Sequence, residues 1–412
     1  MNKHPTITLS SILNVLLVYC LLRFGLVMTT GFSLFSLPLV VAVGAAIVAL
    51  CLILAKSFAN RLLRLNALFL MLNIVCIFIA SIATTRAEFI AVATNYMNQL
   101  LVLFLLWAFY LYLGELDVRS RNRLVLIYLL LLLVSTAYTL YVEMNGHERI
   151  IRNTAFGEYD DTFRFLYGGF DFIYGLVLVY SILLTVLLHG KEKIKTAVKV
   201  FIIASLALLA FTVIGSGYTT AFAIILIFTL LSLIRSIPGR IILFVVLILG
   251  FFIFPRQLAD FILSLTFIPE LTTTRIADLI LSFTGQATAE YLSMEGQRLD
   301  RMRWSIEAFF AHPLFGVIGN SATNKLGYHT EWIDQLARYG IIPFLLHSMF
   351  WVQTGRNMLQ DNCKKSITVL CLKNTLFLYF LLGFLNPISM VITTAPLFLL
   401  CPFVEELFIT SD

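Results

Sequence analysis

The stretch LVLIYLLLLLVSTAYTLY, from Leu124 to Tyr141, decides the fold because it carries no charged residue along its whole length. A second stretch of this kind, IILFVVLILGFFIF, runs from Ile241 to Phe254. A helix of about 20 apolar residues is needed to cross the ~30 Å hydrocarbon core of a membrane. Both stretches are continuously apolar and do not alternate, so they predict helices, which satisfy every backbone polar group within lipid.

The composition of the whole chain agrees with this interpretation. Hydrophobic residues make up 60% of it and charged residues 13%, whereas soluble proteins carry roughly a quarter charged residues. We therefore expect residues 1–412 to form a single polytopic all-α integral membrane domain, with a first helix that is retained and not cleaved as a signal peptide. The hydropathy pattern predicts about twelve transmembrane helices, over residues 10–30, 34–55, 62–83, 96–114, 124–143, 165–188, 197–214, 217–235, 240–255, 331–353, 367–385 and 388–408.

The basic residues gather in five short connections between these segments. The clusters are Lys56, Arg61 and Arg64; Arg119, Arg121 and Arg123; Lys191, Lys193, Lys195 and Lys199; Arg235 and Arg240; and Arg356, Lys364, Lys365 and Lys373. The positive-inside rule assigns them to the cytoplasm, together with both termini. The net charge of +6 therefore predicts contact with a lipid bilayer and indicates no nucleic-acid partner. The same topology predicts two long external loops, a smaller one at 143–164 and a large one at 255–330 that contains short amphipathic helices.

Several kinds of chemistry have no motif in this sequence. It contains no phosphate-binding GxxxxGK[ST], no GxGxxG after a strand and no HExxH. The six cysteines lack metal-type spacing, and none lies in a predicted external loop. Many membrane glycosyltransferases hold a divalent metal with an acidic pair in the first external loop, but that loop here, Thr29 to Ser33, contains no acid, and the pair Glu115 and Asp117 falls beside a cytoplasmic basic cluster. We expect no metal site and no cofactor.

Three arginines concentrate in the large loop, close to the membrane. Arg298, Arg301 and Arg303 lie in the segment 297–311, whose apolar residues share one helical face before His312-Pro313 ends the helix. Guanidinium groups bind phosphate oxygens in a bidentate manner. The residues alone favour equally a phosphate-binding site and an interfacial helix whose arginines contact lipid headgroups.

A histidine and a polar stripe follow the arginines. We expect Thr330 to cap the helix that starts after it, which leaves His329 at the external helix N-terminus, where phosphates are attracted. Glu331, Gln335 and Arg338 then share one helical face. His329 is a candidate general base or phosphate ligand, although a structural role for an interfacial histidine is equally open.

These residues also carry a family resemblance. The run QRLDRMRWSIEAFFAHPLFGVIGN (297–320), followed by HTEWIDQLARYGII (329–342), resembles the O-antigen polymerase family, which shares a superfamily with the O-antigen ligases. The resemblance implies a GT-C-like bundle in the bacterial inner membrane, with its active site facing the periplasm. It also implies transfer of oligosaccharide repeat units from one undecaprenyl diphosphate carrier onto another, without a metal, and a chain-length regulator and a flippase as further partners.

Family roles transfer onto individual positions of this chain. Arg298 resembles the family's loop arginine and His329 its histidine before the helix, with Arg301, Arg303 and Arg338 as further candidate diphosphate ligands and Glu331 as a second candidate base. Many relatives carry another arginine in an earlier external turn. Here that turn reads GSGYTT (215–220), so Tyr218 is the candidate substrate-binding residue at this point.

Two other functions are compatible with the sequence. An O-antigen ligase would transfer finished glycan to lipid A–core, although the LARYGII continuation is more typical of polymerases. A transporter or flippase of lipid-linked sugars is the alternative from another class. Transporters of that kind usually contain inverted repeats and broken helices near the midplane, and the sequence shows no internal repeat.

Overall fold

The computed structural model describes residues 9–26, 37–54, 60–62, 64–82, 87–145, 168–190, 193–234, 236–265, 273–274, 277, 280–281, 289–318, 325–386, 388 and 393–409. This part of the chain is helical and contains no strand. The long helices are α1 (Leu9–Gly25), α2 (Leu37–Leu54), α4 (Leu65–Ile82), α5 (Ala87–Glu115), α6 (Val118–Met144), α8 (Phe170–His189), α9 (Thr196–Gly215), α10 (Thr219–Leu233), α11 (Ile237–Ile253), α14 (Ala289–Ala311), α16 (Ile341–Asp361) and α17 (Ser366–Leu385). Shorter ones are α12 (Pro255–Leu263), α15 (Glu331–Tyr339), α18 (Ala395–Leu399), η4 (Cys401–Phe403) and α19 (Val404–Phe408).

Six of the described helices are long and apolar enough to cross a membrane. They are α4, α5 from Ile90 onward, α6, α8, α9 and α17. Several helices also keep large apolar side chains exposed, among them Phe78 and Ile79 on α4 and Ile242 and Phe252 on α11. Exposed apolar surface of this extent indicates contact with lipid. The predicted all-α membrane protein is thus confirmed, whereas the finer prediction of twelve spans stays a prediction.

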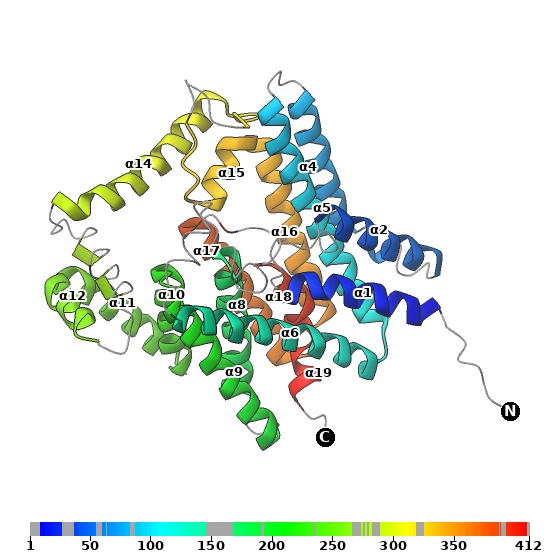
Figure 1. Cartoon of the computed structure of the whole chain (residues 1–412), viewed down its shortest axis with the longest axis horizontal. Coiled ribbons are helices and arrows are strands. Elements are labelled where there is room, and N and C mark those ends of the chain that lie inside the picture. The colour runs from blue at the N-terminus through cyan, green and yellow to red at the C-terminus, as the bar shows by residue number, and fades with distance from the viewer. Residues whose placement is uncertain are drawn as a thin grey trace.

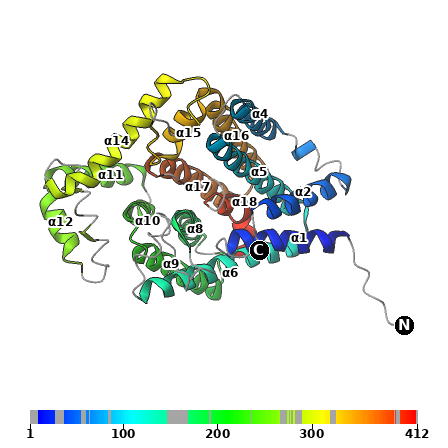
Figure 2. The ribbon, with the colours of Figure 1, turned by 45° about the horizontal axis from the view of Figure 1, so that its top comes forward.

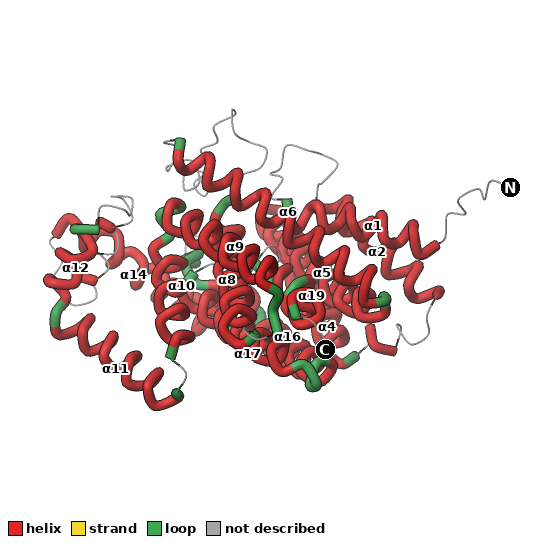
Figure 3. The backbone as a smooth tube through the Cα atoms, turned by 90° about the horizontal axis from the view of Figure 1, so that it is seen from below, coloured by secondary structure: helices red, strands yellow, loops and turns green. Residues whose placement is uncertain are grey.

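The core forms where α8 packs against α9, α10 and α17 (Figures 1 and 3). Almost every side chain of α8 between Phe172 and Val186 is buried. A second group of helices, α4, α5 and α16, packs beside it. Asn66 on α4 donates to Thr354 Oγ1 on α16 at 3.0 Å. This buried hydrogen bond ties the two helices together where water cannot compete for the polar groups.

One end of the bundle is rich in ion pairs between residues far apart in sequence. Arg64 Nη1 lies 3.1 Å from Asp361 Oδ2, and Arg61 Nη1 lies 2.6 Å from Glu115 Oε1. Arg121 and Lys365 both contact Glu406 at the same end. Residues of three of the five basic clusters therefore lie at this end of the bundle, whereas its assignment to the cytoplasmic side stays a prediction. In Figure 1 the helices α14 and α15 lie at the other side of the molecule from the C-terminus.

Two segments that were predicted as single continuous helices are each divided into shorter helices in the structure. The segment 331–353 breaks at Gly340, which has a φ of 79°, so α15 ends there and α16 starts in a new direction. Left-handed backbone of this kind cannot continue a right-handed helix. The segment 388–408 is divided among α18, η4 and α19. Pro396 and Pro402 contribute to these breaks because proline lacks the backbone donor that a continuing helix needs.

Candidate functional site

The predicted site residues lie around the junction of α14 and α15. Helix α14 approaches α15 from the side and packs along it (Figures 1 and 2). It ends at Ala311, immediately before the predicted stop at His312-Pro313. Residues 325–330 then lead into α15.

Backbone hydrogen bonds hold the turn after α14 against the C-terminal end of α15. Val317 N donates to Ala337 O at 3.1 Å, and Ile318 N donates to Arg338 O at 2.8 Å. Gly316, at φ 66°, has no room for a side chain, because a Cβ there would lie 2.3 Å from the carbonyl carbon of Arg338. The glycine therefore allows the close backbone approach that fixes the two helices relative to each other.

A buried aspartate organises the segment that carries His329. Asp334 on α15 accepts a hydrogen bond from Ser305 Oγ on α14, and its Oδ2 accepts another from Thr330 N at 2.8 Å. Ser305 Oγ in turn accepts from Gly327 N at 2.8 Å. Asp334 and Ser305 are buried. Together they attach the segment before α15 to both helices and leave its backbone little freedom.

Arg301 and His329 are in direct contact. Arg301 Nη1 lies 2.9 Å from His329 Nε2, although the residues are 28 positions apart. A guanidinium can only donate, so Nε2 is the acceptor and this nitrogen is unprotonated. The resulting site combines a fixed positive charge with an imidazole nitrogen that bears a lone pair.

Glu331 lies two positions after His329 at the start of α15. Gln335 Nε2 donates to Glu331 Oε1 at 2.6 Å. The backbone N–H of Glu331 donates to Asn386 O at 3.1 Å. Burial raises the pKa of Glu331 to about 8, with the carboxylates of Asp171 and Asp334 adding to the rise against the opposing effects of Gln335 and Arg338. A carboxyl group that is largely protonated at neutral pH is suited to proton transfer.

Arg338 lies on the same face of α15 and contacts two aromatic rings. Its guanidinium carbon is 4.9 Å from the centre of the Tyr328 ring and 5.7 Å from that of Tyr339. Its Nε has no hydrogen-bond partner among the described residues. Tyr328 itself has a φ of 55°, which is uncommon for a residue with a side chain. Strained backbone of this kind often occurs where a side chain must be held for function.

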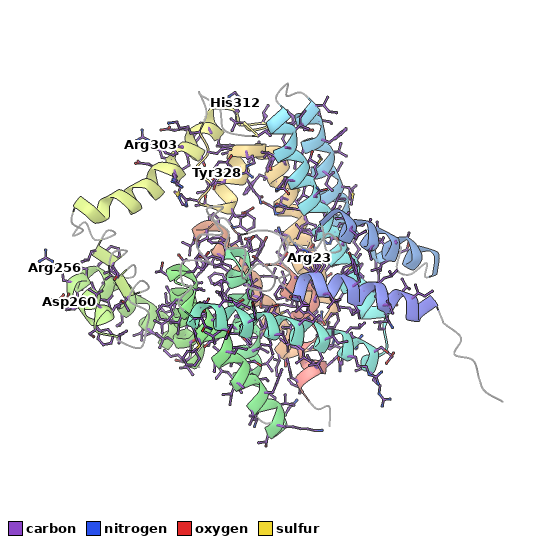
Figure 4. All side chains as sticks on the ribbon, viewed as in Figure 1. Arg23, Arg256, Asp260, Arg303, His312 and Tyr328 are labelled. Atoms are coloured by element: carbon purple, nitrogen blue, oxygen red, sulfur yellow. The ribbon has the colours of Figure 1, made fainter. Side chains whose placement is uncertain are left out.

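Some predicted site residues lie elsewhere. Arg303 projects away from α15 (Figure 4), is 75% exposed and pairs with Glu307 at 2.7 Å. Tyr218 lies in another aromatic cluster, 5.2 Å from the ring of Phe170 and 6.1 Å from that of Tyr174. Arg298 belongs to α14, one turn before Arg301, but its side chain lies outside the described residues.

The prediction that Thr330 is the N-cap of α15 is confirmed for its position but not for a hydrogen bond from its side chain. Thr330 occupies the N-cap position, yet its hydroxyl makes no capping hydrogen bond. Asp334 accepts from the backbone of Thr330, and Asn386, at the end of α17, accepts from that of Glu331. One contact within α15 and one from the end of α17 thus bind the backbone N–H groups at the helix start.

Sequence reasoning missed two central residues, Ser305 and Asp334. Both carried a weak signal, because each places a polar group next to apolar positions: Ser305 beside Ile306 on α14 and Asp334 after Trp332-Ile333 on α15. A polar side chain at a buried position usually has a specific partner. Which partner it has does not follow from spacing, since the two residues lie 29 positions apart.

The arrangement contains the groups needed for anion binding and for proton transfer. Arg301 and Arg338 supply positive charge, and His329 and Glu331 supply acid–base groups. Among the described residues, no three His, Cys, Asp or Glu side chains lie close enough to share a metal ion. A scan against protein-family models finds no match for this chain, and no curated protein is significantly similar to it.

Proposed function

We propose that the chain is a membrane glycosyltransferase that polymerises a surface polysaccharide on the periplasmic side of the bacterial inner membrane. Its donor and acceptor are oligosaccharide repeat units on undecaprenyl diphosphate. The observation that supports this best is the 2.9 Å contact between Arg301 and His329, which precedes Glu331 by two positions. It unites a phosphate ligand with acid–base groups, as the resemblance to O-antigen polymerases implies.

The reaction needs no group beyond these side chains. The acceptor sugar hydroxyl attacks the anomeric carbon of the donor, the bond from that carbon to the diphosphate oxygen breaks, and the lipid diphosphate leaves. Arg301 and Arg338 stabilise the negative charge of the leaving group. The hydroxyl proton passes to His329 or to the ionised form of Glu331.

The contact of Arg301 with His329 suggests how substrate binding prepares the base. Nε2 accepts from the guanidinium. A diphosphate that draws the guanidinium toward itself releases this lone pair for the acceptor hydroxyl, so that one event binds the donor and prepares the base.

The test is a glycan ladder from a strain that lacks this gene and expresses defined variants. We expect wild type to restore long chains and His329→Ala to give lipid A–core with single repeat units, because ligation continues without polymerisation. Arg298→Ala should behave in the same way. Arg303→Ala is the matched control, since its side chain points away from the site, and should restore the ladder.

Two results would contradict the proposal. Bare core with free polymer accumulating on its carrier in the His329→Ala strain would indicate a ligase. Accumulation of repeat units on the cytoplasmic side in the deletion strain would indicate a transporter. Protein levels in the membrane fraction must be equal for all variants.

A further inference from the structure

A groove of about 500 Å³ runs along the surface between α16 and α17. Its lining is predominantly apolar and comprises Trp351, Val352, Gly355, Arg356, Leu359, Gln360, Cys363, Leu376 and Phe380. Trp351 lies in the middle of α16, Phe380 lies in the second half of α17, and Cys363 lies in the turn that joins the two helices. The groove therefore extends from mid-helix to the end of the bundle that carries the ion pairs.

Gly355 gives the groove its depth. A Cβ at this position would come within 3.2 Å of Leu376 Cδ1 on the opposite wall. Any larger residue would fill the space between the helices. An apolar groove of this kind, beside a helix (α17) that is long and apolar enough to cross a membrane, is shaped for a hydrocarbon chain.

One cation lines the groove and a second lies near it. Arg356 is exposed and belongs to the lining, whereas Lys373 does not line the groove but is exposed on α17, one helical turn before the lining residue Leu376. Neither forms an ion pair or hydrogen bond with a described residue. Other cations at this end of the bundle do have acidic partners: Arg64 pairs with Asp361 at 3.1 Å and Lys365 pairs with Glu406 at 2.5 Å. The positive charge at the groove is thus left for a ligand.

We propose that this groove binds an anionic phospholipid of the cytoplasmic leaflet. One acyl chain lies along Val352, Leu376 and Phe380, and the phosphate contacts Arg356 and Lys373. The flexible lysine stem lets its charged end reach the headgroup region. Basic pockets between transmembrane helices on the cytoplasmic side bind anionic headgroups in this way.

The site is separate from the one proposed for glycosyl transfer. The groove occupies the half of α16 that ends at Asp361, whereas Arg301 and His329 lie beside α15, which adjoins the opposite end of α16 at Ile341. A carrier lipid serving the transfer site would place its diphosphate at that opposite end. The groove's cations are therefore positioned for an ordinary membrane lipid.

The experiment is a lipid titration of the purified full-length protein in detergent, read by native mass spectrometry. The probes are dioleoyl phosphatidylglycerol, which is anionic, and dioleoyl phosphatidylcholine, which is zwitterionic. We expect Arg356→Gln with Lys373→Gln to weaken phosphatidylglycerol binding roughly 30-fold and to leave phosphatidylcholine binding almost unchanged. Val352→Trp fills the mouth of the groove from an exposed position and should weaken binding of both lipids.

The control removes the same charge elsewhere at this end of the bundle. Arg119→Gln with Arg123→Gln alters two exposed arginines at the start of α6. We expect this variant to keep phosphatidylglycerol affinity within about twofold. Equal losses in the two double variants would show that the attraction is non-specific and would overturn the proposal. Displacement of bound phosphatidylglycerol by equimolar undecaprenyl diphosphate would overturn it in favour of the carrier lipid.

Discussion

Ser305 donates a hydrogen bond to Asp334 and so joins α14 to α15 inside the protein. The same aspartate accepts from the backbone of Thr330, and the same serine accepts from the backbone of Gly327. Two side chains thereby fix the segment that positions His329. The stability of this junction and the activity of the site should consequently depend on the same hydrogen bonds.

Asp334→Asn should destabilise the protein by about 1–3 kcal/mol, because one buried partner of the carboxylate is left without an acceptor. The measurement is the apparent melting temperature in detergent. Ser305→Ala should destabilise the protein by a similar amount. The double variant should lose less stability than the sum of the losses in the two single variants. Additive effects would show that the two residues do not act together.

Arg301→Ala should abolish polymer formation, and Arg301→Lys should restore little of it, because lysine lacks the bidentate fork. Glycan ladders from strains with equal protein levels provide the measurement. Arg303→Ala is the matched control on the same helix. Long glycan chains in the Arg301→Ala strain would show that Arg301 is not required for polymer formation.

Glu331 gives a prediction for pH dependence. Its pKa rises from 4.5 to about 8 in the folded protein, chiefly through burial, with Asp171, Asp334, Gln335 and Arg338 as its polar neighbours. Between these pH values the folded protein holds a proton that the unfolded chain releases, so the contribution of Glu331 to stability declines as pH rises through this window. The melting temperature of the Glu331→Gln variant should therefore exceed that of the wild type at pH 8.5 but not at pH 4.5. A difference that does not vary with pH would contradict the shifted pKa.

Gly340→Ala should destabilise the α15–α16 junction by at least about 1 kcal/mol, because φ is positive there. The new Cβ would also lie 2.2 Å from Leu314 O. Gly250→Ala is the control, since a Cβ at that position in α11 meets nothing within 4 Å. Melting temperatures in detergent report both effects, and equal values for the two variants would show that the turn at Gly340 tolerates a side chain.

Much of the fold was predictable, because lipid imposes helices on continuous apolar runs. The predicted segment 367–385 differs from α17 by a single residue, and 197–214 differs from α9 by one at each end. Hydropathy failed at Gly340, where the apolar pattern continues through a break in the backbone. Glycine is tolerated within membrane helices, so its presence alone does not predict a positive φ.

The site was only partly predictable. The polar stripe predicted for Glu331 and Gln335 is confirmed by their hydrogen bond, because spacing of four residues on a helix fixes that geometry. The contact of Arg301 with His329 depends on how α14 packs on α15, which no local pattern records. The same packing turns Arg303 away from the site, although it is two residues from Arg301.

The indole of Trp332 occupies space that only a glycine at position 383 leaves open. Its Nε1 donates to Phe380 O at 2.8 Å, and a Cβ on Gly383 would lie 2.3 Å from Cε2 of the ring. The two positions therefore share a fixed volume. A homologous chain with a bulkier residue at position 383 should therefore carry a smaller residue at position 332. We expect substitutions at these two positions to occur together.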